Sequence, residues 1–409
     1  MRIGFDASVL RHGVTNGTAV YAYHLVEALL GLDGAHRLVL YCGARLDPAG
    51  REALERLRGL GATLVIGPAP WRWSPDAAWW LPVRAPIESL FESIDVFHVG
   101  ELFFPPAGRV PYVATVHDVT PQTMPHVHTR LNRWLHDKRL RWIERFADRV
   151  IVVSKSTRDD LLRVSDIPPN RIDTVYEARG RANTNDGRSD TTRPPTSPGG
   201  SPAPGGPYVL SVGTLEPRKN HVRLIQAFES IADRYPELRL KLVGGWGWHS
   251  NPIREAIEGS PVRSRIDVLG RVLPEEMGRL YSHATVFAFP SLYEGFGLPL
   301  LEAMAAGVPV LTSNLSSMPE VVGDAAVMVD PTSVDSIAQG LESLLADERL
   351  RKALIERGRA REREFSWTLA ARQTLDTYRR AIRDCGRGTQ RDASDVVAAD
   401  HVRNSARDL

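Results

Sequence analysis

Two glutamates eight positions apart flank a glycine-containing stretch, a pattern that suits a phosphorylated, hydroxylated ligand. Glu294 and Glu302 are joined through GFGLP at 295–299, which follows an apolar run at 286–289. Pro299 suits the first turn of a helix, so the glycines fall where the backbone can approach a ligand and unpaired N–H groups point outward. The two carboxylates would then lie beside an anion site and accept hydrogen bonds from sugar hydroxyls. The alternative is an ordinary strand–loop–helix turn with a capping glutamate.

A second group of candidate residues is GTLEPRKN at 213–220, directly after the apolar run 208–212. Arg218 and Lys219 are expected in the first turn of the following helix, where cations oppose the macrodipole at a cost of roughly 0.3 to 1 kcal/mol each. A bound diphosphate would reverse that cost, and an arginine can bind it bidentately. The alternative is a solvated surface turn, because exposed charges contribute little to stability.

Two features of the first half fit the opposite wall of a cleft. Gly17 follows the first expected strand and opens a helical pattern that Thr18 can cap, so a second anion could approach there. His117 lies in YVATVHD at 112–118, at the carboxyl end of a buried strand, where ligands collect in open α/β sheets. Taken singly, glycines after a strand are common turn chemistry, and a lone histidine is more often structural.

The elements that must position these residues alternate along the chain. Short apolar, β-rich runs alternate with helical patterns in both halves, which predicts an α/β fold with parallel sheets. The predicted strands are 3–5, 38–41, 63–66, 96–99, 112–115 and 150–153 in the first half, and 208–212, 238–243, 266–269, 286–289, 308–312 and 326–329 in the second.

The chain has 409 residues, too many for one ordinary core, and two domains are the simplest interpretation. Residues 178–207 hold six prolines, six glycines and no aromatic residue, which predicts a flexible linker. The predicted order is a first domain at 1–177, this linker, a second domain at 208–365, a closing helix at 366–383 and a disordered tail at 384–409.

The composition excludes several classes of protein. The chain is 43% hydrophobic and 24% charged, as in a globular protein, and it has no run of about 18 apolar residues to span a bilayer. The N-terminus lacks the pattern of a secretory signal, so a cytoplasmic location is expected. A net charge of +2 gives no reason to expect nucleic acid as a partner.

Two segments suggest contact with a further surface. Residues 129–146 carry six Lys or Arg against two acids, with apolar residues at helical spacing. This segment could lie peripherally on the anionic inner surface of a membrane, although the general rule for amphipathic helices favours a core-packing helix with a solvated basic face. The Trp-rich stretch 71–80 suits either an acceptor-facing or membrane-facing lip, or the apolar lining of a surface helix.

Several of these stretches together resemble the family 4 glycosyltransferases of the GT-B fold. The resemblance rests on GTLEPRKN at 213–220, VLGRV at 268–272, SLYEGFGLPLLEAMAAGVPV at 291–310, PEVVGDAA at 319–326 and FSW at 365–367. It covers nearly the whole chain apart from the linker and the tail. It implies two Rossmann-like domains whose parallel sheets face a central cleft, the first on the acceptor side and the second binding the donor nucleotide.

The resemblance also implies retaining transfer of a sugar from a nucleotide-diphosphate donor, without a metal or a cofactor. Candidate catalytic residues are His117 against the transferred sugar, Arg218 and Lys219 on the diphosphate, and Glu294 on the sugar. Candidate binding residues are the backbone of Gly295, Phe296, Gly297 and Leu298 for sugar and phosphate, Glu302 for the ribose, Arg271 and Val272 near the base, and Gly17 and Thr214. Many members carry Arg where Thr214 stands, and Arg218 is expected to supply that charge. The family's usual Pro-Asn-Gly segment is replaced by VYEA at 175–178 and the linker.

The combination of GTLEPRKN with VHD is most similar to mannosyltransferase-type members that build bacterial polysaccharide such as lipopolysaccharide. It implies mannose or a related hexose as the transferred sugar. GDP-mannose is the favoured donor, with a UDP-linked sugar as the alternative, and the acceptor is a glycan or a lipid-linked glycan.

Other classes of function remain to be compared. GWGWHS at 245–250, with Asp267 about twenty residues later, approaches the dinucleotide fingerprint of an NAD-type dehydrogenase. Ser250 replaces the third glycine, and the motif does not follow the first strand of its sheet, so this interpretation is disfavoured. A retaining hydrolase would need two carboxyl groups about 5 to 5.5 Å apart, and no pair is obviously arranged that way. A non-catalytic partner that binds a sugar nucleotide stays open, since the expected side chains are all present.

Overall fold

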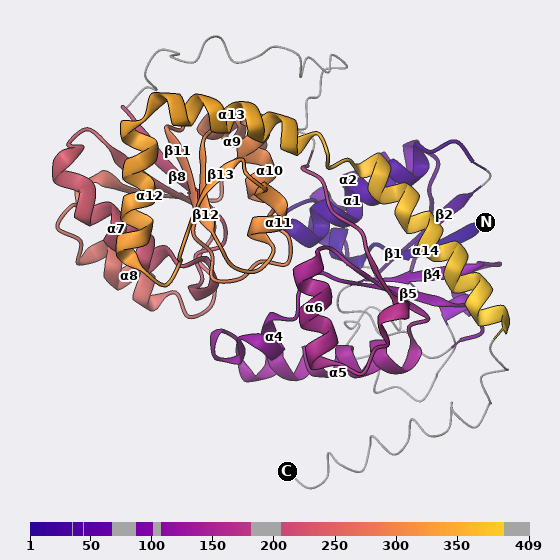
Figure 1. Cartoon of the computed structure of the whole chain (residues 1–409). Helices are drawn as coiled ribbons and strands as arrows, with labels where there is room; N and C mark the ends of the chain where they lie inside the picture. The colour runs from indigo at the N-terminus through magenta and orange to yellow at the C-terminus, as the bar shows by residue number, and fades with distance from the viewer. Residues whose placement is uncertain (35, 44, 68–86, 101–107, 181–205, 388–409) are drawn as a thin grey trace, which may run out of the picture.

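The computed structural model describes residues 1–409 except 35, 44, 68–86, 101–107, 181–205 and 388–409. The described residues form two α/β units, each built on a parallel sheet (Figure 1). The first sheet has the strand order β3-β2-β1-β4-β5-β6-β7, and the second has β10-β9-β8-β11-β12-β13. In each sheet the chain runs outward from its first strand and then crosses back to that strand's other side. Ligands bind at such switch points, outside the carboxyl ends of the strands.

All twelve strands predicted from the sequence are confirmed. The first sheet contains β1 (Arg2–Asp6), β2 (Arg37–Cys42), β3 (Thr63–Ile66), β4 (Val96–Val99), β5 (Tyr112–Val116), β6 (Arg149–Val152) and β7 (Ile172–Thr174). The second contains β8 (Tyr208–Val212), β9 (Arg239–Val243), β10 (Ile266–Gly270), β11 (Val286–Phe289), β12 (Val310–Ser313) and β13 (Ala326–Val329). The additional strand, β7, has three residues and is too short to show a hydrophobic period.

The helices cover the sheets. The first unit carries α1 (Gly17–Leu30), α2 (Pro48–Gly59), α4 (Thr120–Thr123), α5 (Arg130–Phe146) and α6 (Lys155–Val164). The second carries α7 (His221–Ile231), α8 (Asn251–Glu258), α9 (Pro274–Ser282), α10 (Leu298–Ala306), α11 (Met318–Val322), α12 (Val334–Ala346) and α13 (Glu348–Glu362), and α14 (Trp367–Arg387) follows. The expectation that Thr18 caps α1 is wrong: the Asn16 side chain accepts from the Ala19 N–H, and Thr18 donates its hydroxyl to Asn16.

The closing helix α14 leaves the second unit and lies along the first, as the yellow ribbon in Figure 1 shows. Its Tyr378 hydroxyl bonds His98 Nδ1 on β4 at 2.6 Å, and Asp384 pairs with Arg149 on β6. The helix continues to Arg387, so the prediction of a disordered tail from residue 384 is wrong for 384–387. The rest of that tail lies outside the described residues.

The edges of the predicted linker are packed. Ala178 is buried, and Arg179 bonds both to Glu362 on α13 and, through its carbonyl, to the Trp367 indole N–H. The flexible-linker prediction is therefore wrong for these residues. Most of the predicted linker, residues 181–205, lies outside the described part of the chain.

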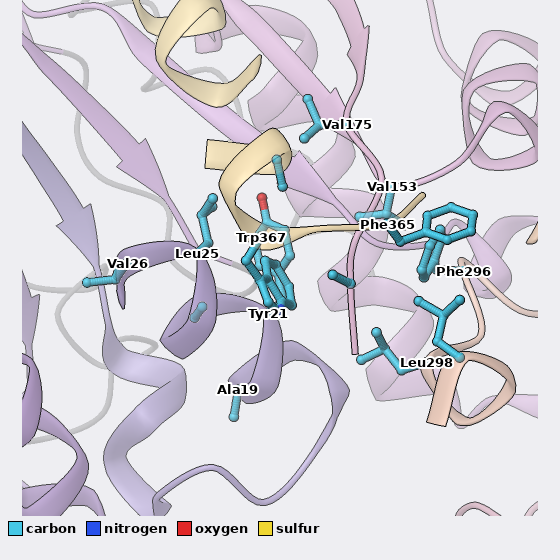
Figure 2. Packing of buried hydrophobic residues seen from close by; sticks show 14 of the residues in the cluster. Ala19, Tyr21, Leu25, Val26, Val153, Val175, Phe296, Leu298, Phe365 and Trp367 are labelled. Atoms are coloured by element: carbon cyan, nitrogen blue, oxygen red, sulfur yellow. The ribbon is translucent and has the colours of Figure 1, made fainter. Parts of the chain in front are cut away.

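One hydrophobic cluster runs without a break from the first unit into the second. Figure 2 shows Tyr21 and Leu25 of α1 beside Trp367, and Val153 beside Phe365, which packs against Phe296 of the second unit. Burial of a large apolar side chain stabilises by roughly 1.5 to 3 kcal/mol. The shared cluster therefore holds the loop around Gly295 against the first sheet.

The basic segment 129–146 forms α5, and its Trp142 and Ile143 are buried against the first sheet. This confirms the core-packing interpretation for one face. The other face leaves Leu131 66% and Trp134 44% exposed, with Lys138 stacked over the Trp134 ring.

The Trp-rich stretch 71–80 lies outside the described residues. Within the described part of the chain, no helix combines the length and apolar character needed to cross a membrane.

Candidate active site

The glycine-containing turn lies where the sequence predicts it, between β11 and α10. Gly297 is the N-cap of α10 with φ of 112°, a left-handed conformation that disfavours other residues, and Pro299 follows in the first helical turn. Glu294 is on the loop at the carboxyl end of β11, and Glu302 is inside α10. The strand–loop–helix geometry is confirmed, and it opens the N-terminus of α10 at the edge of the second sheet.

Arg218 and Lys219 do not begin a long helix, contrary to the prediction. They belong to the short 3-10 turn Pro217–Lys219, and Asn220 with φ of 62° separates this turn from α7. The Asn220 side chain donates to the carbonyls of Pro290 and Pro331, which holds the left-handed conformation in place. The two cations therefore precede α7 rather than occupying its first turn.

Both cations bind Glu294 directly. Arg218 Nη1 lies 2.7 Å from one carboxylate oxygen of Glu294, and Lys219 Nζ lies 2.6 Å from the other. Arg218 also pairs with Glu216 at 2.8 Å and donates to the Tyr293 carbonyl at 2.9 Å. Two acids and two cations thus form a compact, nearly buried cluster whose formal charges cancel.

The protonation equilibria of this cluster follow from burial and from the ion pairs. Burial alone would raise the pKa of Glu294, but the charges of Arg218 and Lys219 outweigh it and hold that pKa below its ordinary value. Burial raises the pKa of Glu216 despite the same two cations. Burial also lowers the pKa of Lys219, and Glu294 offsets this only in part. Glu294 is accordingly the firmly ionised partner that keeps the cations in position.

His117 reaches the same region from the first unit, just beyond β5. Its Nδ1 bonds Glu177 at 3.0 Å, and the Tyr21 ring packs edge-on against the imidazole with centroids 4.7 Å apart. Gly295 of the second unit touches its backbone, because a Cβ on Gly295 would come within 2.0 Å of the His117 carbonyl oxygen. The structure therefore brings His117 and the Glu294 loop together across the two units.

The other candidate residues lie around this centre in different environments. Gly17, at the start of α1, faces the Leu298 side chain of the second unit. The Phe296 side chain is buried among Tyr176 and Phe365, so only its backbone can meet a ligand. Glu302 accepts from the Tyr281 hydroxyl at 2.8 Å, and burial raises the pKa of this carboxyl.

Thr214 and Arg271 are exposed on the loops after β8 and β10, and Val272 is partly buried. Both loops border residues 244–250: a Cβ on Gly247 would lie 2.7 Å from Thr214 Cγ2, and one on Gly245 would lie 3.2 Å from Arg271 Nε. The same Cβ on Gly247 would lie 3.2 Å from Glu216 Cβ, so the loop that carries Thr214 borders the Glu294 cluster.

The dehydrogenase interpretation of GWGWHS fails on geometry. Asp267, which should reach a ribose at the carboxyl ends of the strands, is the second residue of β10 and pairs with Arg239 at the start of β9. It therefore lies at the amino ends of the strands, on the wrong side of the sheet for a dinucleotide.

Among the described residues, no group of three or more His, Cys, Asp or Glu side chains is arranged to hold a metal ion.

Three residues of this region were missed by the sequence reasoning. Glu216 is part of the GTLEPRKN stretch, but no periodic pattern in the sequence indicates that it is a second counterion to Arg218. Glu177 follows β7, at the carboxyl edge of the sheet beside His117. Because β7 was not predicted from the sequence, this position of Glu177 was not predicted either. Asp118 follows His117, and although burial would raise its pKa, the charge of Arg218 across the interface lowers it.

Comparison with known proteins agrees with the fold and with these motifs. The family model "Glycosyl transferases group 1" matches residues 197–361, and "Glycosyltransferase Family 4" matches residues 15–178. The O-antigen chain mannosyltransferase B of Escherichia coli is 35% identical over 390 residues, covering 93% of this chain and all of that protein.

Solved structures show the same architecture at low identity. Anabaena HepE in complex with UDP and glucose superposes with a TM-score of 0.67 at 17% identity, over 93% of this chain and all of that one. Sucrose-phosphate synthase from Thermosynechococcus elongatus gives a TM-score of 0.65 at 19% identity, over 94% of this chain and 99% of that one.

Two parallel-sheet units with candidate site residues on the loops at their carboxyl edges define a GT-B glycosyltransferase. The chain belongs to the family 4 glycosyltransferases, and its second half carries a group 1 glycosyl transferase domain.

Proposed function

We propose that this glycosyltransferase moves mannose or a related hexose, with retention and without a metal, from a nucleotide-diphosphate donor to a glycan or lipid-linked acceptor in polysaccharide biosynthesis. The observation that carries the proposal is the cluster of Glu294, Arg218 and Lys219 on the second unit, with His117 facing its loop from the first. No cofactor is required by this chemistry.

Sugar transfer requires that the negative charge on the departing diphosphate be stabilised as an oxocarbenium-like sugar forms. Arg218 and Lys219 can supply it, because Glu294 and Glu216 already hold them in position and little reorganisation is needed. The N–H groups at the start of α10 add a second anion-binding element. Glu294, its charge shared with both cations, is suited to orient sugar hydroxyls rather than to act as an acid.

Mannose is favoured as the transferred sugar because the E. coli relative that aligns over its whole length is an O-antigen chain mannosyltransferase. A GDP-linked donor is the corresponding choice. A UDP-linked hexose is the alternative, since the Anabaena neighbour was solved with UDP and glucose.

Titration with GDP, UDP and NAD, followed by heat and by intrinsic Trp fluorescence, tests the donor class directly. GDP is expected to bind most tightly, and GDP-mannose is expected to support sugar transfer to a polysaccharide or lipid-linked acceptor. Tight GDP binding without any transfer would instead identify a non-catalytic partner. Preference for UDP would reassign the donor, and preference for NAD would overturn the proposal.

The protein is proposed to work in the cytoplasm, with α5 in peripheral contact with the inner membrane surface. One surface depression on α5 is lined by Arg130, Leu131, Arg133, Trp134 and Asp137, so two cations and two apolar side chains stand against a single acid there. Such a face binds anionic interfaces through apolar insertion and charge attraction.

Replacing both Leu131 and Trp134 by serine is expected to reduce binding to phosphatidylglycerol-containing vesicles by about tenfold, since both side chains are apolar contacts at the interface. Sedimentation with vesicles measures this. Leu273→Ser is the matched control, because Leu273 is 70% exposed on the second unit. Equal binding of all three proteins would contradict membrane contact through α5.

A further inference from the structure

The first turn of α6 lies where the two halves of the candidate site meet. Thr157 is fully buried, and its hydroxyl lies 3.3 Å from the His117 carbonyl of the first unit and 3.2 Å from the Gly295 carbonyl of the second. Both carbonyls belong to residues beside the proposed reaction centre. One side chain therefore touches the backbone of both units.

The surrounding hydrogen bonds direct the single Thr157 proton to these two carbonyls. The Ser154 hydroxyl donates to Thr157 Oγ1 at 3.0 Å, and the Thr157 N–H donates to Ser154 Oγ at 2.9 Å. Because Ser154 supplies a proton to Thr157 Oγ1, the Thr157 hydroxyl is left to donate, and its hydrogen is shared between the His117 and Gly295 carbonyls. Each carbonyl is thereby held at a defined distance from the other.

The same helix is fixed to the second unit at further points. The Glu320 carboxylate accepts from the Lys155 N–H at 3.1 Å and the Ser156 N–H at 3.0 Å, so it satisfies two free donors at the start of α6. The Tyr293 hydroxyl, next to Glu294, donates to Asp160 at 2.6 Å. The N-terminal half of α6 thus forms a joint between the two units, held by several hydrogen bonds.

Steric fit also fixes the position of the Gly295 backbone relative to the His117 backbone. Gly295 has no room for a Cβ, which would come within 2.0 Å of the His117 carbonyl oxygen and 3.3 Å of Asp118 Cβ. Any other residue would push the two backbones apart. The contact is therefore both hydrogen-bonded and size-limited.

We propose that Thr157 is a positioning residue that sets the distance between His117 and the Glu294 loop through this shared hydrogen bond. The inference rests on the proposed function, because it assigns the joint to the alignment of donor sugar and His117. Misplacement of reacting groups by about 1 Å costs on the order of 100-fold in rate even when the altered residue is remote. The groups proposed to bind the donor diphosphate, Arg218, Lys219 and the start of α10, lie on the second unit, so donor binding should depend mainly on them and little on Thr157.

The test compares Thr157→Val, which removes the hydroxyl at nearly constant volume, with Thr157→Ser, which keeps it. Thr157→Val is expected to lower kcat by about tenfold or more while KM for the donor changes little, and Thr157→Ser is expected to restore most of the rate. Thr377→Val is the control: Thr377 is also buried and hydrogen-bonded, but to Asp173 and Gln373. Thr377→Val should lose stability to a similar extent as Thr157→Val, but its kcat should stay close to that of the wild type.

The outcomes separate this inference from the proposed function. A wild-type protein that transfers no sugar overturns the proposed function itself. An active wild type with Thr157→Val equally active, or with Thr157→Ser as slow as Thr157→Val, overturns the positioning role alone. If Thr157→Val does not fold, Gly295→Ala is the second variant, because its added Cβ would push the Gly295 and His117 backbones apart. Full turnover of Gly295→Ala would also contradict the proposal that the spacing of these two backbones matters for catalysis.

Discussion

Lys219→Met is expected to lower kcat/KM for the nucleotide-sugar donor by about 100-fold or more, the usual loss when one preorganised stabiliser of developing charge is removed. The Lys219 side chain is only 11% exposed, so water cannot readily take the place of its ammonium group. The loss should appear mainly in kcat, because charge on the diphosphate develops as the bond to the sugar breaks. Steady-state kinetics with varied donor measure it.

Folding should survive this substitution, because Glu294 keeps Arg218 as its partner. Lys241→Met provides a matched control. Lys241 belongs to the same unit and stacks over Tyr208 at 4.0 Å, much as Lys219 stacks over Phe289 at 4.7 Å. Thermal melting of both variants checks stability. If Lys219→Met and Lys241→Met were equally active, Lys219 would have no part in stabilising the leaving group.

The fold could be predicted from the sequence because its determinants are local. Apolar runs such as 208–212 and 286–289 became buried central strands, and Pro299 with Gly297 fixed the start of α10. The predicted site residues lie together because parallel strands bring their carboxyl ends to one edge. A local pattern is enough for both inferences.

The pairing within the site could not be predicted, because it depends on contacts between distant segments. Glu294 and Lys219 are 75 positions apart, and no period in the sequence relates them. Thr157 and Gly295 are 138 apart and belong to different units. The placement of Arg218 and Lys219 in the first turn of α7 was wrong for the same reason. A left-handed Asn220, held by the carbonyls of Pro290 and Pro331, ends the 3-10 turn before α7 begins.

Glu294→Ala is expected to reduce sugar transfer by at least about tenfold and to lower the free energy of unfolding by about 3 to 5 kcal/mol, since it leaves a buried cation unpaired. Arg218 would keep Glu216, but Lys219 would lose its direct carboxylate partner. Glu294→Gln retains the shape and one acceptor oxygen, so it should unfold at a higher temperature than the alanine variant. Denaturant unfolding and transfer kinetics on the same preparations separate the two effects.

Glu216→Gln decides whether Glu294 acts on the sugar or only as a counterion. Glu216 and Glu294 both neutralise Arg218, and both are nearly fully buried. Because Glu294 also pairs with Lys219, the two glutamine variants are compared in the Lys219→Met background, where each removes one negative charge from the same guanidinium and a mere counterion role for Glu294 predicts similar losses of activity. A sugar-orienting role requires Glu294→Gln to lose far more kcat than Glu216→Gln, because Gln offers one acceptor oxygen where the carboxylate offers two, and the weakened bonds are to hydroxyls of the transferred sugar. Similar losses in the two variants would assign Glu294 to the electrostatics of the cluster and leave His117 as the candidate group on the sugar.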